Sequence, residues 1–310
     1  MATIFLDGAA GTTGLQIRDR LAPRDDIELV ELVGEARKDP ACRADALNAA
    51  DLTILCLPDD AARESVALAK DDRVRILDAS TAHRVAEGWV YGMPEYAPGH
   101  ADRIRGAARV SNPGCYAVAS VSLLHPLVAG ELLPADTPVS IHATSGYSGG
   151  DRQMIEQYES VPPDERCEVP LRLYGLDLEH KHVGEIHAHS GLTLRPIFVP
   201  SVGRYPQGMV VQIALQLSGL PGRPSPGALR EQLQGWYRDS KQVEVCDAVA
   251  DARSFRVDAD ELAGSDLLRL HVFGHDDHEQ AVLVAVLDNL GKGAAGSAVQ
   301  NAELMLESLA

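Results

Sequence analysis

The sequence predicts an α/β protein with two domains, the first built on a doubly wound parallel sheet and the second on an α+β arrangement. Two observations predict this fold class. Short apolar runs alternate with Ala-rich helical segments in the first part of the 310 residues, and a period-two alternation of apolar and polar residues replaces that pattern later. A hydrophobic content of 45% is enough to fill the cores of two ordinary domains.

The first domain contains four candidate strands, at residues 3–7, 27–33, 52–57 and 75–78. Segments rich in good helix formers lie between them, at residues 15–21, 41–49 and 61–70. Strands that alternate with helices in this way pair in parallel and have helices on both faces of the sheet.

The second domain shows a different pattern. Val211, Ile213, Leu215 and Leu217 alternate with more polar residues, as in a half-buried strand. Residues 268–272 and 281–287 predict an antiparallel hairpin around a turn at 274–278, and residues 294–309 predict a final helix. The change in composition after about residue 115 places the domain boundary between residues 1–114 and residues 115–289.

Charge and composition exclude several classes of protein. A net charge of −17 argues against nucleic acid or an anionic membrane as the main partner. No apolar stretch reaches the length of a membrane-spanning helix, and the first residues do not have the pattern of a signal peptide. The five cysteines are widely spaced without a CxxC motif, which indicates reduced thiols and a cytoplasmic protein.

A glycine-rich turn, GAAGTTG at residues 8–14, follows the first predicted strand and opens a helix. In that position it predicts a dinucleotide site, because a turn without side chains lets helix N–H groups approach a pyrophosphate. The residues expected there are Gly8, Gly11, Thr12, Thr13 and Gly14.

The residues after the second strand bear on the choice between NAD and NADP. Glu35 is available to bind a ribose, but Arg37 and Lys38 follow at once and suit a 2′-phosphate, so the sequence favours NADP(H). The alternative is that both cations are solvated loop residues. Leu57 and Pro58 end the third strand at the edge where a dinucleotide passes, and we expect them to contact it.

Cys115 is the candidate nucleophile. It follows the segment Ser111–Gly114 and precedes residues spaced like an amphipathic helix, so it is expected at a helix N-terminus, where a thiolate is stabilised. Cys56, inside an apolar strand, fits the alternative of a buried hydrophobic cysteine better. A thiolate beside a nicotinamide site implies reduction through an acyl-enzyme.

Five segments carry a family resemblance: YGMPE at 91–95, SNPGCY at 111–116, TSGYSG at 144–149, HKHVGE at 180–185 and NLGKGAAG at 289–296. With these the sequence resembles the N-acetyl-γ-glutamyl-phosphate reductases, in the shorter of that family's two types. Aspartate-semialdehyde dehydrogenases share the architecture but usually carry Asn where this chain has Gly114.

The resemblance implies a Rossmann-like NADP-binding domain at residues 1–114, to which the C-terminal helix 290–310 returns. It implies a catalytic and dimerisation domain at residues 115–289. Cys115 would form a thioester, and His180 would help to deprotonate the thiol and later protonate the oxyanion. Asn289 and Gly293 would bind the cofactor, and the substrate would be held by Arg84, Asn112, Ser145, Gly146, His182 and Glu185.

Two parts of the resemblance leave alternatives open. Residues 81–83 before Arg84 and Gly184 in the histidine segment depart from the family's usual residues, and surface ion pairing is the alternative role for Arg84. In a strand, His180 and His182 would share one face, as would His187 and His189, so a metal site is conceivable. The acyl-transfer chemistry needs no metal, and we expect none.

The expected function is NADPH-dependent reduction of an acyl phosphate in arginine biosynthesis. The alternatives are reduction of an aspartyl or aminoadipyl phosphate, and a redox-sensing NADP-binding protein without catalysis. The expected partners are a small-molecule substrate and further copies of the chain, as a dimer or tetramer.

Overall fold

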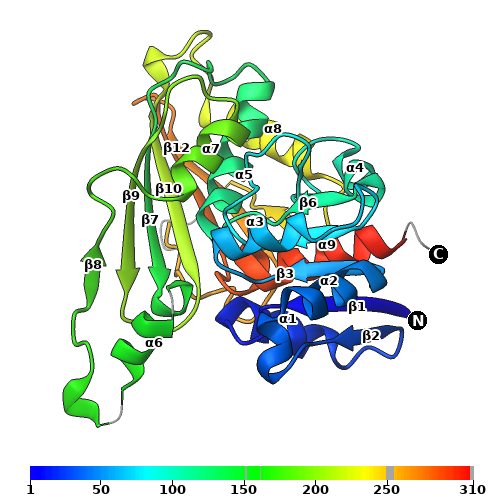
Figure 1. Ribbon diagram of the computed structural model, residues 1–310. Coiled ribbons are helices and arrows are strands. Elements are labelled where there is room, and N and C mark those ends of the chain that lie inside the picture. Colours follow the sequence, from blue (N-terminus) through cyan, green and yellow to red (C-terminus); the bar gives the residue numbers. More distant parts are fainter. Residues whose placement is uncertain (151, 161, 249–254, 308–310) are drawn as a thin grey trace. The chain divides into compact units, whose positions relative to one another are not determined.

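The computed structural model describes residues 1–150, 152–160, 162–248 and 255–307. The chain forms two compact units, Met1–Gly114 with Ala294–Ala310, and Cys115–Gly293. Each unit is described separately below, and Figure 1 labels their helices and strands. In the described part of the chain, no helix has both the length and the apolar character needed to cross a membrane.

The first unit is built on a six-stranded sheet in the order β2-β1-β3-β4-β6-β5, with every pairing parallel. Its strands are β1 (Ala2–Asp7), β2 (Ile27–Val30), β3 (Leu52–Leu55), β4 (Ile76–Asp78), β5 (Val90–Tyr91) and β6 (Arg109–Ser111). Its helices are α1 (Thr12–Leu21), α2 (Pro40–Ala49), α3 (Asp59–Ala67), α4 (His100–Gly106) and α9 (Gly296–Glu307), with a short 3₁₀ helix at Gly34–Lys38.

Both faces of this sheet are covered, because adjacent residues of each strand point to opposite sides. Ile4 and Leu6 of β1 belong to a buried cluster with residues of α1, α4 and α9. Phe5 of β1 belongs to a second cluster, on the other face, with Leu47 of α2 and Ala62 of α3. The predicted doubly wound sheet is therefore confirmed, including the return of the C-terminal helix to the first unit.

The second unit contains a seven-stranded mixed sheet in the order β11-β12-β13-β10-β7-β9-β8. Its strands are β7 (Ser140–Gly146), β8 (Leu171–Leu173), β9 (Ile197–Gly203), β10 (Met209–Gln216), β11 (Val243–Val245), β12 (Leu268–His275) and β13 (Gln280–Leu287). Its helices are α5 (Cys115–Ala129), α6 (Arg152–Glu159), α7 (His182–Ser190) and α8 (Pro226–Tyr237), followed by a π-helix at Gly291–Ala295.

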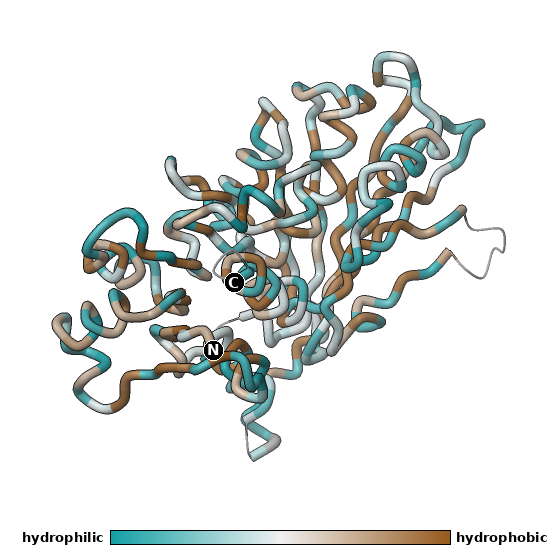
Figure 2. The backbone as a smooth tube through the Cα atoms, turned by 90° about the vertical axis from the view of Figure 1, so that its right-hand side faces the viewer, coloured by the Kyte–Doolittle hydropathy of each residue, from teal (hydrophilic) through white to brown (hydrophobic). Residues whose placement is uncertain are grey.

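One face of this sheet packs against α5, α7 and α8 in a single large core. The predicted alternation in β10 is confirmed, since its residues are buried and more exposed in turn. The predicted hairpin is also confirmed, because β12 and β13 pair antiparallel from Leu268↔Leu287 to His275↔Gln280. Figure 2 colours the backbone by hydropathy and shows brown hydrophobic stretches interleaved with teal hydrophilic ones along the tube.

Two predicted strand ends were wrong. β2 ends at Val30 and β3 at Leu55, both earlier than expected. β3 ends where its partner β1 ends, since Leu55 pairs with Asp7, whereas β2 already ends opposite Phe5. Cys56 therefore follows β3 instead of lying in it. The final helix is described as far as Glu307, and the expected last turn at residues 308–309 lies outside the described residues.

Candidate active site

The glycine-rich turn connects β1 to α1, and its backbone requires glycine at two positions. Gly8 has a φ of +92°, and a Cβ placed on it would lie 2.4 Å from the carbonyl oxygen of Cys56. A Cβ on Gly14 would lie 2.6 Å from the carbonyl oxygen of Gly8. No side chain therefore fits at either place, and the backbone of this turn stays open to a ligand.

The N-terminus of α1 suits an anion. The helix begins at Thr12 after Gly11, no side chain caps its first N–H groups, and its first turn carries no acidic residue. Uncapped N–H groups at a helix start attract phosphate oxygens through hydrogen bonds and the helix dipole. Gly11, Thr12 and Thr13 are placed as the sequence predicts.

A cleft of about 620 Å³ lies beside this turn, and it brings several predicted cofactor residues together. Gly8, Leu57, Arg37 and Lys38 all line it, whereas Glu35 is not among its lining residues. Arg18 of α1 also lines it, a residue that sequence reasoning missed because nothing in its neighbourhood marks it. Pro58 does not line it and serves as the N-cap of α3.

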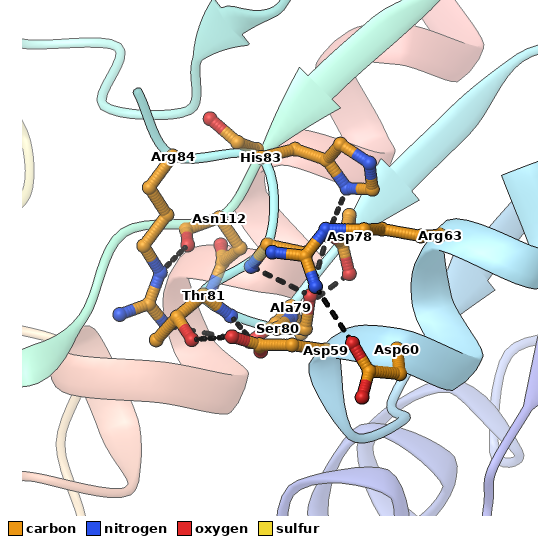
Figure 3. Close-up of polar contacts among 12 residues, drawn as sticks. Asp59, Asp60, Arg63, Asp78, Ala79, Ser80, Thr81, His83, Arg84 and Asn112 are labelled. Atoms are coloured by element: carbon orange, nitrogen blue, oxygen red, sulfur yellow. Dashed lines mark hydrogen bonds and ion pairs between the residues drawn. The ribbon is translucent and has the colours of Figure 1, made fainter. Parts of the chain in front are cut away.

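Arg84 lies in the loop after β4, with its guanidinium held by main-chain oxygens (Figure 3). Its Nε donates to the carbonyl of Asn112 at 3.0 Å, and Nη2 donates to the carbonyl of Ala79 at 3.3 Å. The side chain is 9% exposed, so surface ion pairing, the alternative for this residue, is not its environment.

The loop that carries Arg84 is fixed by one buried carboxylate, as Figure 3 shows. Asp78, at the end of β4, accepts hydrogen bonds from the N–H and hydroxyl of Ser80 and contacts Nδ1 of His83 at 2.6 Å. The ring of His83 also stacks on Trp89 at 4.1 Å. His83, one of the residues that depart from the family's usual pattern, thus has a clear structural role in this loop.

Asn112 lies at the end of β6 and is 2% exposed. Its Nδ2 donates to the carbonyl of Ala294 at 3.1 Å, and its Oδ1 accepts from Asn301 at 3.0 Å. Both polar atoms of the side chain therefore take part in contacts that join β6 to the C-terminal segment.

Cys115 is the first residue of the 15-residue helix α5, as predicted. The next residue, Tyr116, is buried, and its hydroxyl lies 3.1 Å from that of Tyr174. The pKa of Tyr174 is raised to about 12, chiefly by burial and with a smaller contribution from the charge of Cys115. Cys115 therefore lies within electrostatic range of Tyr174, a residue that sequence reasoning missed because it follows an unremarkable edge strand.

His180 belongs to the same cluster. Its ring packs edge-on against Tyr116 and Tyr174, each at 5.7 Å, and against Phe198 at 5.1 Å. Burial among these rings lowers the pKa of His180 to about 4, and the charge of Lys181 contributes in the same direction. The imidazole is therefore neutral at pH 7.

The position of the proton on His180 follows from one hydrogen bond. The backbone N–H of His182 donates to Nδ1 of His180 at 3.2 Å. In a neutral imidazole one nitrogen accepts and the other carries the proton, so this bond assigns the proton to Nε2. His180 can thus offer a hydrogen-bond donor from Nε2 while it stays uncharged.

The strand geometry considered for the histidine segment does not occur, because residues 182–190 form α7. In a helix, residues two apart point in different directions, so His187 and His189 do not share a face. Within the described residues, no three His, Cys, Asp or Glu side chains are grouped so that they could hold a metal ion. Gly184 lies inside this helix and not in a loop, while His182 and Glu185 are buried.

Ser145 and Gly146 end β7. The Ser145 side chain is 3% exposed and donates to the carbonyl of Gly146 at 3.0 Å. The Gly146 N–H donates to Gly208 at 2.9 Å, and a Cβ on Gly146 would lie 2.7 Å from the Gln207 nitrogen. The N–H of Gly146, which we expected to face the substrate, is therefore engaged by Gly208.

Asn289 and Gly293 follow β13. Asn289 accepts from the N–H of Gly208 at 2.7 Å and donates to the hydroxyl of Ser148 at 2.9 Å, so its amide joins two loops of the second unit. A Cβ on Gly293 would lie only 2.8 Å from the Cβ of Cys115. Gly293 thus lies directly against the candidate nucleophile.

Comparisons with known families cover most of the chain. Residues 3–104 match the family described as semialdehyde dehydrogenase, NAD binding domain. Residues 115–289 match semialdehyde dehydrogenase, dimerisation domain. The two matched ranges agree with a division into a nucleotide-binding part and a second part that begins at Cys115.

Solved structures with a similar fold include aspartate-semialdehyde dehydrogenases. That of Francisella tularensis has a TM-score of 0.72 and 12% identity, covering 98% of this chain and all of the other. That of Candida albicans, determined with NADP, has a TM-score of 0.66 and 15% identity, covering 99% of both chains. At this level of identity the likeness concerns the fold alone.

Curated relatives are far more similar in sequence. N-acetyl-gamma-glutamyl-phosphate reductase 2 of Pseudomonas putida is 50% identical over 306 residues, which cover 99% of this chain and 97% of the relative. N-acetyl-gamma-glutamyl-phosphate reductase of Brucella ovis is 52% identical over 304 residues, which cover 98% of both. This chain therefore belongs to the N-acetyl-gamma-glutamyl-phosphate reductase family.

Proposed function

We propose that this chain catalyses the NADPH-dependent reduction of N-acetyl-L-glutamyl 5-phosphate to N-acetyl-L-glutamate 5-semialdehyde and phosphate, in arginine biosynthesis. The observation that carries the proposal is the position of Cys115. It begins α5, follows Gly114 and lies beside a cluster that contains the neutral His180. The names of relatives about half identical over the whole chain support the same reaction.

In the first half of the reaction, Cys115 acts as the nucleophile. Its thiolate attacks the acyl carbon, the bond from that carbon to the phosphate oxygen breaks, and the phosphate leaves with the electron pair and takes up one proton. The N-terminus of α5 stabilises the thiolate that this step needs. The product is a thioester on Cys115.

In the second half, the thioester is reduced and released. NADPH, when bound, supplies the hydride. The carbonyl oxygen of the thioester then becomes an oxyanion, and its collapse breaks the carbon–sulfur bond, frees the aldehyde and returns the thiolate. A hydrogen-bond donor aimed at this oxygen lowers the barrier without having to transfer its proton.

His180 is proposed as that donor. A pKa of about 4 keeps the ring neutral, and the bond from the His182 N–H places the proton on Nε2. A neutral imidazole can stabilise an oxyanion in this way. This supports the role of His180 at the oxyanion more than the expected role in deprotonating the thiol, which would need the other tautomer.

The substrate's phosphate and carboxylate require cations and donors, and we propose Arg84 as the main anion-binding residue. Ser145, His182 and Glu185 are proposed to contact the substrate, each being buried in the second unit. Asn112 and Gly146 are proposed to shape the site mainly through the structural hydrogen bonds described above.

The first unit is proposed to hold NADP(H). Gly8 and Gly14 leave no room for side chains at the turn, the first N–H groups of α1 are uncapped, and the adjoining cleft is lined by Arg37 and Lys38. These features fit a pyrophosphate and a 2′-phosphate. Asn289 and Gly293, which follow β13 in the second unit, are also proposed to bind the cofactor.

The alternative function is that of an aspartate-semialdehyde dehydrogenase or an aminoadipyl-phosphate reductase. Gly114 before the cysteine favours the N-acetylglutamyl substrate over the aspartyl one. The reverse reaction discriminates between them, by measuring phosphate-dependent reduction of NADP⁺ with each semialdehyde. Turnover with aspartate semialdehyde at a kcat/KM equal to or above that with N-acetylglutamate semialdehyde would overturn the proposal.

We further propose that the protein acts in the cytoplasm as a dimer or tetramer. The second unit matches a family described as a dimerisation domain. Its edge strand β8 carries Leu171 and Leu173, each more than half exposed, which suits contact with another copy.

Replacing both Arg37 and Lys38 with alanine should raise KM for NADPH about 10-fold or more and leave KM for NADH nearly unchanged. The reason is that both residues line the cleft beside the glycine-rich turn. Initial rates with each cofactor measure this, and Lys70→Ala, at an exposed site outside that cleft, is the matched control. If KM for NADPH does not change, the pair is merely solvated surface.

Turnover should survive exhaustive treatment with EDTA, since the proposed steps use a thiolate and an imidazole and no Lewis acid. The measurement is the rate before and after chelation, with the protein's metal content determined in parallel. If chelation abolishes turnover and added zinc restores it, histidines of this segment would instead be metal ligands. The candidates would be His180, His182, His187 and His189.

A further inference from the structure

A buried lysine lies in the segment that follows β13. Lys292 is 1% exposed and is among the largest fully buried side chains of the described residues. Its Nζ donates to Oε1 of Gln242 at 2.9 Å. An ammonium is costly to bury, and an apolar side chain of the same length would fill this space without that cost. The position therefore calls for a role beyond packing.

The backbone around Lys292 is confined on both sides by glycines. A Cβ on Gly291 would lie 2.0 Å from the carbonyl oxygen of Ser265, and a Cβ on Gly293 would lie 2.8 Å from the Cβ of Cys115. Lys292 is thus the one side chain between two points where the backbone touches its neighbours. The residues form a π-helix, a rare conformation that is frequent at functional sites.

The start of this segment is fixed by a second buried polar residue. Asp288 is fully buried, and its carboxylate accepts from the N–H of Leu290 at 2.9 Å, from the N–H of Gly264 at 2.7 Å and from the amide of Gln207. The segment therefore has a polar anchor at each end, Asp288 before the π-helix and Lys292 within it. Lys292 directly precedes Gly293, the glycine that touches Cys115, and the N–H of Gly293 donates to the carbonyl oxygen of Asp288 at 2.9 Å.

We propose that Lys292 is a positioning residue for the nucleophile. Its hydrogen bond to Gln242 holds the π-helix in the place where Gly293 packs against the β-carbon of Cys115, and this contact fixes the direction of the thiol. The inference rests on the proposed role of Cys115. A displacement of about 1 Å at a reacting group can cost on the order of 100-fold in rate, so a remote anchor of this kind has a measurable effect.

The test compares Lys292→Met, Gln242→Leu and the double variant, all in a Cys167→Ser background that removes a partly exposed competing thiol. Lys292→Met is unbranched and only one atom shorter than lysine, and Gln242→Leu removes the same hydrogen bond without altering the π-helix sequence. The readouts are the rate of Cys115 alkylation by iodoacetamide from pH 6 to pH 9, kcat, KM and Tm. Lys241→Met, which removes an exposed neighbouring charge, is the control.

We expect Lys292→Met to slow alkylation of Cys115 and to lower kcat, each by about 10-fold or more, while KM for the substrates changes by less than about threefold. Gln242→Leu should act in the same direction, the double variant should be no worse than Lys292→Met, and Lys241→Met should match the parent. If the Lys292–Gln242 hydrogen bond only stabilised the fold, the variants would have a lower Tm but unchanged alkylation and kcat.

Unchanged alkylation and kcat in Gln242→Leu would overturn the inference, as would strictly additive effects in the double variant. If Lys292→Met fails to fold, Gln242→Leu decides the question by itself. Because alkylation needs no substrate, it still reports on the thiol if the proposed reaction proves wrong.

Discussion

Cys115→Ser is expected to lower turnover by on the order of 10⁴-fold or more while NADPH still binds with its normal affinity. A serine hydroxyl has a far higher pKa than a thiol and forms a poorer acyl carrier, so the thioester route closes. Cofactor affinity should not change, because the glycine-rich turn and its cleft belong to the other unit. Steady-state rates and NADPH fluorescence titration measure the two quantities.

Alkylation of the native protein provides the companion measurement, and Cys115 should react fastest. Burial raises the pKa of Cys56 to about 12, and it also raises the pKa values of Cys42 and Cys246. Cys167 is the competitor, since the backbone N–H of Val169 leads a set of contacts that lower its pKa. Peptide mapping separates the two fast thiols, and Cys167→Ser should leave turnover intact.

A Cys115→Ser variant that reduced the acyl phosphate at the normal rate would exclude the covalent mechanism. Direct attack of hydride on the acyl phosphate would then be the remaining route. A normal rate in Cys115→Ser combined with loss of rate in Cys167→Ser would move the nucleophile to the second thiol.

The first unit was largely predictable because its pattern is local. The strands β1, β2 and β3 are short apolar runs, the helices α2 and α3 between strands are rich in alanine, and the position of the glycines fixes the first turn. The sequence did not predict the residue at which the pairing of neighbouring strands ends. Residues 31–33 continue the apolar pattern of β2, yet β2 ends at Val30, opposite Phe5, although β1 itself continues to Asp7.

The position of a site residue could be predicted only where it is determined by the residues next to it in the sequence. Cys115 begins a helix because its flanking residues dictate one, and the structure has it there. The alternating His residues have a period of two, which would suit a strand, whereas buried Val183 and Ile186 are spaced for one face of α7. Tyr174 and Arg18 are brought to the site by the tertiary fold, and no local sequence pattern predicts their positions there.

His180→Asn is expected to lower kcat about 100-fold or more, because it removes the donor proposed for the oxyanion. His180→Gln should retain more activity than His180→Asn. The amide nitrogen of Gln can reach the place of Nε2, from which the neutral imidazole donates, whereas the shorter Asn side chain reaches only the place of Nδ1. Cofactor affinity should be normal in both variants, as measured by NADPH titration.

The pH profile separates a neutral donor from a general base. A pKa of about 4 means that His180 gains its charge only as the pH falls well below its ordinary value of 6.5. Between pH 5.5 and pH 8 the wild-type enzyme and His180→Asn should therefore give kcat/KM profiles of the same shape at different levels. A general base with a pKa near 6.5 would give the wild type an acidic limb in this range that the Asn variant lacks. Such a limb, together with equal losses in the Asn and Gln variants, would reject the neutral donor and restore His180 as the group that deprotonates the thiol.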